Sequence, residues 1–207
     1  MATAVKICGI TRAEDGRAAA YCGAHAIGLV FHAPSPRNVG IAQARAIVQA
    51  LPPFVTVVGL FVDAPAATVR DTLSQVPLQV LQFHGDESPA FCAGFDLPYI
   101  KAIRVTPRAD LVKCAHAYRD AKALLLDAYV EGVHGGTGAV FDWRLIPERL
   151  PLPVVLSGGL NPDNVTEAIR AVRPWAVDVS SGVEAARGIK DRLKIAAFIA
   201  GVRNADV

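Results

Sequence analysis

Hydrophobic positions fall into eight short runs along the chain, and each run ends near a polar residue or a glycine. The runs occupy residues 4–9, 26–31, 55–63, 78–83, 98–105, 121–127, 153–159 and 175–182. Near-continuous apolar runs of this length are typical of strands that are buried on both faces of a parallel sheet. The pattern therefore predicts eight buried strands.

Between these runs, apolar residues recur at spacings of three and four, which is the period of an amphipathic helix. Such stretches lie at 12–21, 41–51, 65–76, 108–119 and 161–172. Strands that alternate with helices pair in parallel through right-handed crossovers. Eight such units predict an α/β fold, a single closed (β/α)₈ TIM barrel that forms one domain over residues 1–207.

An open, doubly wound sheet is the competing architecture. It would normally carry a glycine-rich phosphate fingerprint after its first strand. The first turn of this chain reads CGITR at 8–12 and has no such fingerprint. The closed barrel is therefore the preferred fold.

The composition supports a folded chain and argues against several kinds of partner. Hydrophobic residues make up 52% of the 207 residues and charged residues 19%, which is enough apolar surface for one large core. The net charge is only +2, and no basic cluster is interleaved with aromatic residues. We therefore expect no nucleic-acid partner.

The four cysteines are Cys8, Cys22, Cys92 and Cys114, and none are spaced as C-x-x-C. This spacing argues against a disulfide framework and a structural zinc site, so we expect no metal and free thiols in a reducing compartment. No signal peptide and no apolar stretch long enough to span a membrane are found, so a cytoplasmic protein without a membrane partner is expected. The oligomeric state is left open, with a monomer as the working assumption.

In a βα barrel the active site forms at the carboxyl ends of the strands, so polar residues that end an apolar run are candidates for chemistry. Asp127 ends the sixth run, where burial would disfavour its charged form and make it a general acid; it could instead only cap the strand. Cys8 ends the first run, with Lys6 two positions earlier on the same face. An ammonium group near a thiol favours the thiolate, so Cys8 is a candidate base, the alternative being a small buried hydrophobe.

The last two predicted strands end in LSGG (156–159) and DVSSG (178–182). Loops after the seventh and eighth strands of such barrels commonly bind phosphate through backbone N–H groups and a short helix, here SGVEAA (181–186). The candidate phosphate-binding residues are Gly158, Gly159, Ser180, Ser181 and Gly182. Ordinary turn chemistry is the alternative explanation for either loop alone.

Other predicted strands also end in polar groups. Arg37 offers a planar fork for a carboxylate, and His84 could orient a hydroxyl or take part in proton transfer. Asp63 is expected to cap the helix that starts near Pro65. His25, His116 and His134 are expected to be solvated or in loops, and His32 is left undecided.

Six motifs at strand ends occur in a fixed order and together span nearly the whole chain. They are KICGIT at 6–11, SPR at 35–37, LQFHGDE at 81–87, LLLDA at 124–128 followed by GGTG at 135–138, LSGGLNPDNV at 156–165 and DVSSGVE at 178–184. In these motifs the chain resembles the phosphoribosylanthranilate isomerase family of tryptophan biosynthesis. Phe83 and the region of His134 differ from the usual pattern of that family.

The resemblance implies a cofactor-free barrel that converts N-(5-phosphoribosyl)anthranilate into 1-(o-carboxyphenylamino)-1-deoxyribulose 5-phosphate by an Amadori rearrangement. It assigns the general base to Cys8 and the general acid to Asp127, the two residues already singled out. By the same resemblance, Arg37 pairs with the anthranilate carboxylate, while His84 and Asp178 line the sugar side. The segment EGVHGGTG (131–138) is expected to form a flap over the aromatic ring.

Two other functions remain in view. A ketol-isomerase barrel of histidine biosynthesis performs the same rearrangement on a substrate with two phosphates, but it normally uses two aspartates, so Cys8 argues against it. A catalytically silent phosphoribosyl-binding module would keep the phosphate loops alone. Both candidate catalytic positions are present here, which argues against this second alternative.

Overall fold

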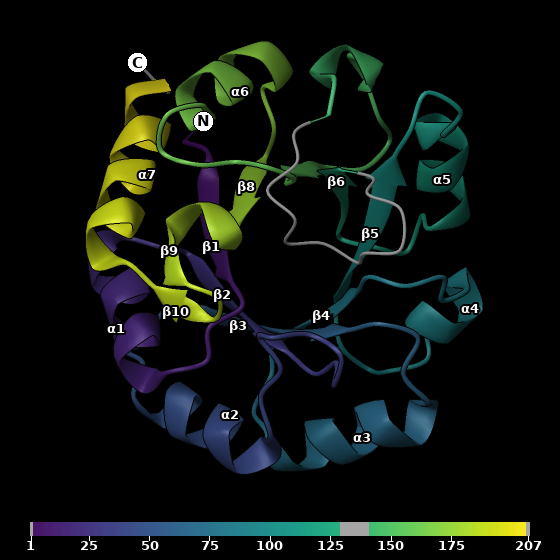
Figure 1. Ribbon diagram of the computed structural model, residues 1–207. Coiled ribbons are helices and arrows are strands. Elements are labelled where there is room, and N and C mark those ends of the chain that lie inside the picture. Colours follow the sequence, from purple (N-terminus) through teal and green to yellow (C-terminus); the bar gives the residue numbers. More distant parts are fainter. Residues whose placement is uncertain (1, 129–140, 206–207) are drawn as a thin grey trace.

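A computed structural model describes residues 2–128 and 141–205, and it has the predicted closed barrel (Figure 1). Eight parallel strands follow one another around the barrel in sequence order, and β8 pairs with β1 to close it. The strands are β1 (Ala4–Cys8), β2 (Ala26–Val30), β3 (Thr56–Phe61), β4 (Val80–Phe83), β5 (Tyr99–Val105), β6 (Ala123–Ala128), β7 (Val154–Leu156) and β8 (Ala176–Val179). The (β/α)₈ prediction is confirmed.

Helices form a ring around the outside of the barrel (Figure 1). They are α1 (Ala13–Cys22), α2 (Ile41–Gln49), α3 (Ala66–Gln75), α4 (Pro89–Cys92), α5 (Leu111–Ala117), α6 (Val165–Val172) and α7 (Arg192–Ala205), with two 3₁₀ helices, η1 (Trp143–Leu145) and η2 (Ser181–Val183). The five predicted helical stretches correspond to α1, α2, α3, α5 and α6. In the described part of the connection from β6 to β7, η1 is the helical element.

The segment expected to continue as a helix after the last strand forms a different structure. SGVEAA starts with the three-residue 3₁₀ helix η2 and continues as strand β9 (Glu184–Ala186). This strand pairs antiparallel with β10 (Ile189–Lys190) to form a small hairpin above the barrel (Figure 1). Gly188 turns the hairpin with a left-handed φ of 78°, a conformation that glycine adopts without strain.

Two further predictions concern the cap expected from Asp63 and the flap expected at 131–138. Asp63 does not cap α3, whose N-cap is Pro65 with no side-chain hydrogen bond. Instead, the Oδ1 atom of Asp63 accepts a hydrogen bond from the N–H of Asp86 at 2.7 Å, so it ties the end of β3 to the loop after β4. The expected flap at 131–138 lies outside the described residues.

Side chains that alternate along the strands separate the outer core from the barrel interior. Outward-facing residues such as Phe61, Phe83 and Tyr99 pack beneath the helices, with the rings of Phe61 and Phe83 6.5 Å apart. Inside, the half of the barrel near the strand starts is filled by small and aliphatic residues: Ala102, Ala123, Leu125, Val155 and Ala176. These packed apolar side chains fill the barrel interior below the polar side chains at the carboxyl ends of the strands.

Candidate active site

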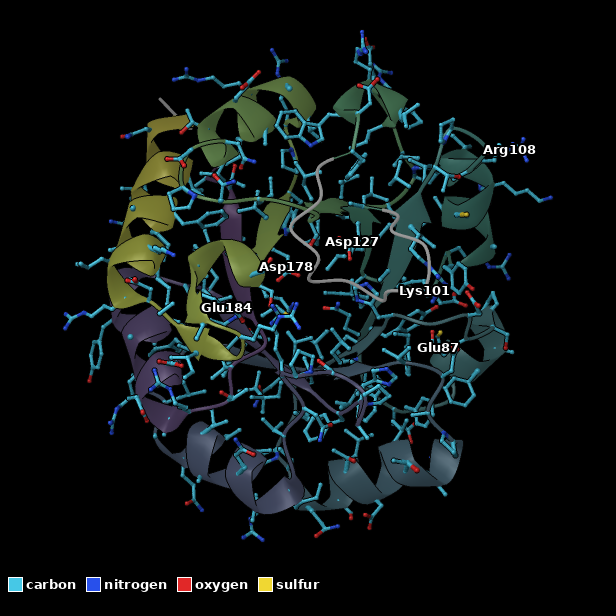
Figure 2. All side chains as sticks on the ribbon, viewed as in Figure 1. Glu87, Lys101, Arg108, Asp127, Asp178 and Glu184 are labelled. Carbon is cyan, nitrogen blue, oxygen red and sulfur yellow. The ribbon has the colours of Figure 1, made fainter. Side chains whose placement is uncertain are left out.

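Polar side chains gather inside the barrel at the carboxyl ends of the strands, in line with the expectation for such barrels. Lys6 and Cys8 alternate with Ile7 on β1, and Asp127 and Asp178 occupy the same inner face of β6 and β8. In Figure 2 the two aspartates lie over the middle of the barrel. All four of these polar residues are buried, with Asp127 only 4% exposed.

Lys6 and Asp178 form a buried ion pair across the junction of the first and last strands. The Nζ atom of Lys6 donates to Oδ1 of Asp178 at 2.8 Å. Burial alone would lower the pKa of Lys6, but the negative charge of Asp178, helped by Cys8, raises this pKa to about 12. Lys6 is therefore a permanent cation next to the thiol of Cys8.

Cys8 has room at this position because its neighbour on β2 lacks a side chain. Gly28 pairs with Cys8 in the sheet, and a Cβ added at Gly28 would lie 2.7 Å from the sulfur of Cys8 and 3.2 Å from Nζ of Lys6. Any side chain at residue 28 would thus displace the thiol. The glycine allows the thiol and the ammonium group to approach each other.

The protonation of Cys8 differs from the simple expectation that Lys6 makes it a thiolate. Burial raises the pKa of the Cys8 thiol, and Asp178 raises it further, whereas Lys6 and Lys190 lower it. The cation therefore acts in the expected direction, but burial outweighs it. In the ligand-free barrel Cys8 is a neutral thiol at neutral pH.

Asp127 is held by contacts at both of its carboxylate oxygens. Its Oδ1 atom accepts a hydrogen bond from the N–H of Ala128 at 2.9 Å, and its Oδ2 atom lies 3.1 Å from Nε2 of His84. Nδ1 of His84 is in turn 3.0 Å from the side-chain nitrogen of Gln82. The structure thus brings the predicted acid and the predicted His84 together, and it adds Gln82, which sequence reasoning missed.

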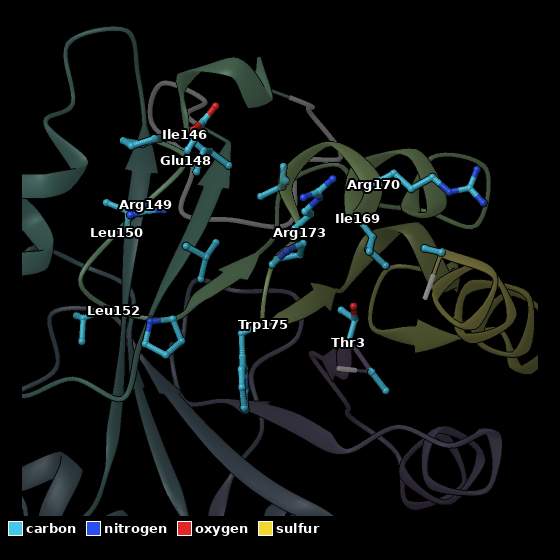
Figure 3. A pocket seen from close by; sticks show the side chains of 17 residues that line it. Thr3, Ile146, Glu148, Arg149, Leu150, Leu152, Ile169, Arg170, Arg173 and Trp175 are labelled. Carbon is cyan, nitrogen blue, oxygen red and sulfur yellow. The ribbon is translucent and has the colours of Figure 1, made fainter. Parts of the chain in front are cut away.

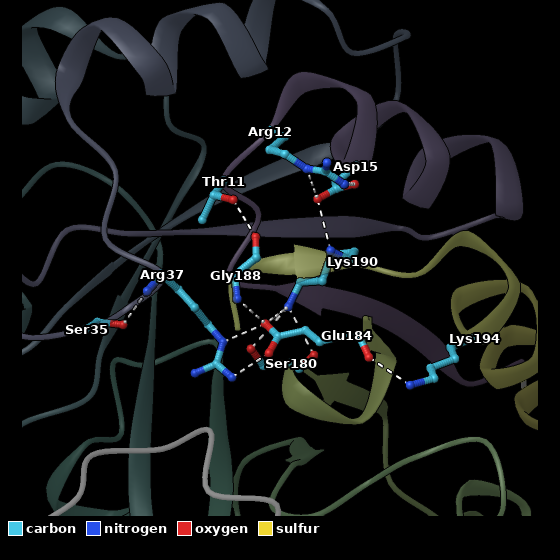
Figure 4. A network of polar contacts seen from close by, with 10 residues as sticks. All are labelled: Thr11, Arg12, Asp15, Ser35, Arg37, Ser180, Glu184, Gly188, Lys190 and Lys194. Carbon is cyan, nitrogen blue, oxygen red and sulfur yellow. Dashed lines mark hydrogen bonds and ion pairs between the residues drawn. The ribbon is translucent and has the colours of Figure 1, made fainter. Parts of the chain in front are cut away.

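Arg37 is buried and its fork is occupied by a carboxylate of the protein (Figure 4). Its Nε and Nη2 atoms donate to the two oxygens of Glu184 at 2.7 and 2.8 Å, which leaves Nη1 outside the pair. Lys190 also donates to Glu184, at 2.8 Å, and its side chain is fully buried. Two cations therefore share one anion, and this excess of positive charge favours an anionic ligand beside Arg37.

Glu184 and Lys190 are further residues that the sequence reasoning did not select. Glu184 lies in the segment that was expected to be helical, and Lys190 lies in a two-residue strand without any recognisable pattern. The quoted motif DVSSGVE contains Glu184, so the motif was the one signal that pointed to this residue. Nothing comparable marks Lys190.

The two candidate phosphate loops lie side by side. Gly182 of the second loop is so close to Leu160, next to the first, that a Cβ on Gly182 would collide with the backbone oxygen of Leu160. Gly158 and Gly159 both have left-handed φ angles, 83° and 66°. A Cβ on Gly158 would lie 2.5 Å from the nitrogen of Ala128 and 3.1 Å from Oδ1 of Asp127. Packing and backbone conformation thus already require glycine at 158 and 182, whichever ligand the loops bind.

Ser180 and Ser181 stand at the start of the second loop. Lys190 donates to the backbone oxygen of Ser180 at 3.0 Å and lies 3.4 Å from its hydroxyl group, while Ser181 begins η2. Ser180, one of the residues predicted to bind phosphate, is therefore connected to Arg37 through Lys190 and Glu184. This network makes one end of the site a continuous unit (Figure 4).

The remaining histidines and cysteines occupy several parts of the chain. His25 and His116 are exposed, His32 is half-buried after β2, and His134 lies outside the described residues. Cys22, Cys92 and Cys114 are free thiols within helices, each at least partly buried. Among the described residues, no group of three His, Cys, Asp or Glu side chains is arranged to hold a metal ion.

A cavity of about 920 Å³ lies at the opposite end of the barrel, where the strands begin. Thr3, Leu152 and Trp175 line it, together with Arg149, Arg170 and Arg173 (Figure 3). The side chains of Cys8 and Asp127 are absent from its lining. This cavity is therefore separate from the candidate active site.

Residues 5–201 match the model of the N-(5'-phosphoribosyl)anthranilate (PRA) isomerase family. The chain belongs to this family. The resemblance seen in the sequence motifs is confirmed, and with it the assignment to an enzyme family of isomerases.

Individual members of the PRA isomerase family are similar over almost the whole chain. The N-(5'-phosphoribosyl)anthranilate isomerase of Thiobacillus denitrificans is 63% identical over 96% of this chain and 97% of its own length. The protein of the same name from Pseudomonas fluorescens strain SBW25 is 59% identical over 96% of this chain and 95% of its own.

Solved structures of PRA isomerases have the same fold. The crystal structure from Thermotoga maritima has a TM-score of 0.90 at 42% identity and covers 98% of this chain and 99% of its own. A PRA isomerase crystallised with reduced 1-(o-carboxyphenylamino)-1-deoxyribulose 5-phosphate has a TM-score of 0.87, also at 42% identity, with the same coverage. In the described part of this chain, none of the helices is long and apolar enough to cross a membrane.

Proposed function

We propose that this chain converts N-(5-phosphoribosyl)anthranilate into 1-(o-carboxyphenylamino)-1-deoxyribulose 5-phosphate, with Asp127 as the general acid and Cys8 as the general base. The observation that carries this proposal is the convergence of a buried carboxyl group and a buried thiol on the inner face of one barrel, at the carboxyl ends of β6 and β1. Membership of the PRA isomerase family supports the choice of substrate.

The reaction requires only proton transfers, and these balance within the substrate and two side chains. Asp127 gives its proton to the ring oxygen of the aminosugar, so that the bond from this oxygen to C1 breaks and a Schiff base forms. Cys8, as the thiolate, then takes the proton from C2, and the electron pair of that bond forms the C1–C2 double bond of an enolamine. Protonation of C1 and loss of the hydroxyl proton at C2 give the ketone and return both side chains to their starting states.

The flanking residues suit the two anionic ends of this substrate. Arg37, in a cluster where two cations share the carboxylate of Glu184, is proposed to bind the anthranilate carboxylate through Nη1. The phosphate is proposed to lie on the loops that contain Gly158, Gly159, Ser180, Ser181 and Gly182. Asp178 would act on the sugar side through its ion pair with Lys6, and His84 through its contact with Asp127.

The test is the fluorescence of freshly prepared N-(5-phosphoribosyl)anthranilate after addition of the purified protein. We expect the signal to decay much faster than the spontaneous rate, and Asp127→Asn and Cys8→Ala each to lower kcat by about 10²- to 10⁴-fold, the range of a lost general acid or base. Circular dichroism serves as the control that both variants fold.

A decay no faster than the spontaneous rate would contradict the function, and wild-type turnover by either variant would contradict the role of that residue. The bisphosphorylated substrate of the related rearrangement is the specificity control. Faster turnover of that compound would reassign the enzyme to the other reaction.

A further inference from the structure

Gln82 is a polar residue in the barrel interior that the proposed mechanism does not use. It lies on β4 two positions before His84, so both side chains point inward, and it is completely buried. A glutamine at such a position carries a cost unless its amide is hydrogen-bonded. Its presence among apolar side chains therefore calls for a partner.

That partner is His84, which links Gln82 to Asp127 in one row across the barrel mouth. The distances are 3.0 Å from Nε2 of Gln82 to Nδ1 of His84 and 3.1 Å from Nε2 of His84 to Oδ2 of Asp127. β5 separates the two strands, and its inward residue Ala102 is small, so the imidazole ring can reach β6. The Oε1 atom of Gln82 is buried and has no hydrogen-bond partner among the described residues.

The contacts of this row fit two arrangements that differ by one proton. With the amide nitrogen of Gln82 donating, Nδ1 of His84 accepts, and the ring proton is on Nε2 and is donated to an Asp127 carboxylate. With the amide turned end for end, Oε1 gains the N–H at Nδ1 as its donor. Nε2 can then accept the proton of a neutral Asp127, or carry a proton as imidazolium beside the carboxylate.

We propose that Gln82 is a positioning residue for the isomerisation, whose amide turns with the gain and loss of a proton by the His84–Asp127 pair and so keeps Asp127 able to donate and recover its proton. An amide suits this task because it offers a donor and an acceptor at one position, whereas an apolar side chain offers neither. The inference rests on the acid role proposed for Asp127.

The residues around His84 fix the loop that follows it, while the His84 ring itself contacts Gln82 and Asp127. Within the described part of the chain, Nδ1 of the ring contacts Gln82 and Nε2 contacts Asp127. The loop that follows His84 is fixed by Lys101, which donates to the oxygen of Gly85 at 2.6 Å and to Glu87 at 2.9 Å. The other charged groups of the mouth are already paired: Arg104 of β5 with Asp86, Lys6 of β1 with Asp178 of β8, and Arg37 and Lys190 with Glu184.

The test is the protonation state of the His84 ring, read by ¹⁵N NMR of protein labelled at histidine, with a His84→Asn spectrum to assign the signals. In the wild type at a pH where the His84–Asp127 pair is deprotonated, we expect the proton on Nε2. Gln82→Met keeps the volume and removes the amide, so the ring should become a mixture of tautomers. Gln82→Glu, as the carboxylate, supplies an acceptor only, so the proton should move to Nδ1.

The same variants are then assayed for turnover. Gln82→Met should lower kcat about tenfold or more, shift its pH profile, and change KM less than threefold, because Gln82 does not touch substrate in the proposed mechanism. Gln79→Met is the matched control: Gln79 lies just before β4 and accepts a hydrogen bond from Val57 at the other end of the barrel. It should leave the His84 spectrum and kcat unchanged.

Three results would overturn the proposal: a wild-type His84 with its proton on Nδ1 in the deprotonated pair, a Gln82→Met spectrum identical to the wild type, or an altered tautomer with unchanged kcat and pH profile. The first needs no Gln82 variant, so the proposal remains testable if Gln82→Met fails to fold. Failure of the Asp127 role is seen separately, as normal turnover by Asp127→Asn.

Discussion

At the scale of single residues, the proposed chemistry depends on a thiol that the fold keeps protonated. Burial raises the pKa of Cys8 from its usual value of 9.0, against the opposing effect of Lys6. A base acts only in its deprotonated form, so the fraction of competent free enzyme should rise with pH across the neutral and alkaline range. The proton on Cys8 is thus expected to limit kcat/KM at neutral pH.

This pH dependence can be measured by alkylation of the thiol with iodoacetamide, with Cys8→Ser as the control for the other three cysteines. The rate assigned to Cys8 should still be increasing above pH 9.0, the usual pKa of a thiol, and kcat/KM should rise over the same range. A Cys8 rate that reaches its plateau below pH 8 would show that Lys6 outweighs burial.

Sequence reasoning found Cys8, Asp127, His84 and Arg37 because each ends an apolar run or lies in a motif. It did not select Gln82, although the motif LQFHGDE contains this residue, and it did not select Lys190. The partners of both residues are defined only in three dimensions. Glu184 and Arg37 are 147 positions apart in sequence. Asp63 was misjudged for the same reason, because its partner is a backbone N–H on the next loop around the barrel and not the adjacent helix.

At the scale of elements, the β9–β10 hairpin gives the site a buried charge cluster. Although burial would raise the pKa of Glu184, hydrogen bonds and charge from Arg37 and Lys190 lower it below its usual value of 4.5. The carboxylate therefore stabilises the fold above about pH 4.5, and this contribution is lost as the pH falls through the lower folded-state pKa.

Glu184→Gln should lower the unfolding free energy at pH 7 by about 3–5 kcal/mol, because it leaves Arg37 and Lys190 buried without their shared anion. Because the variant has no carboxylate at residue 184, its unfolding free energy should fall less than that of the wild type between pH 7 and pH 4. Its KM should rise, because Arg37 loses the carboxylate that holds it in place. Urea unfolding at pH 7 and pH 4 measures both effects. Equal stability of variant and wild type at pH 7 would contradict the role of Glu184.

The elements themselves were largely predictable, since all eight strands and five helices left a clear hydrophobic period. The exceptions are the 14-residue helix α7, which lies outside the five predicted helical stretches, and the shortest elements. α4 has four residues, β9 three and β10 two, and segments of this length contain too few positions to show any period. Their structure is set by contacts such as the hydrogen bond from the N–H of Lys190 to Asp15 at 3.0 Å.

At the scale of the whole molecule, the Lys6–Asp178 pair bridges the strands that close the barrel. Lys6→Met should cost about 3–5 kcal/mol of unfolding free energy, because Asp178 would remain buried without its cation. Combining Lys6→Met with Asp178→Leu removes both charges and should recover most of this loss. The measurement is urea unfolding of both variants at neutral pH, and a single variant as stable as the wild type would contradict the importance of the pair.

The closure of the barrel also bears on when the enzyme becomes competent during its synthesis. Cys8 leaves the ribosome well before Asp178, which pairs with its neighbour Lys6 and follows 172 positions after Lys6. At about 5–20 residues per second, the thiol waits on the order of ten seconds or more for the strand that completes its surroundings. Nascent chains stalled before β8 should therefore contain Cys8 in a form that alkylating agents can reach, and this reactivity should fall once the last strand joins the first.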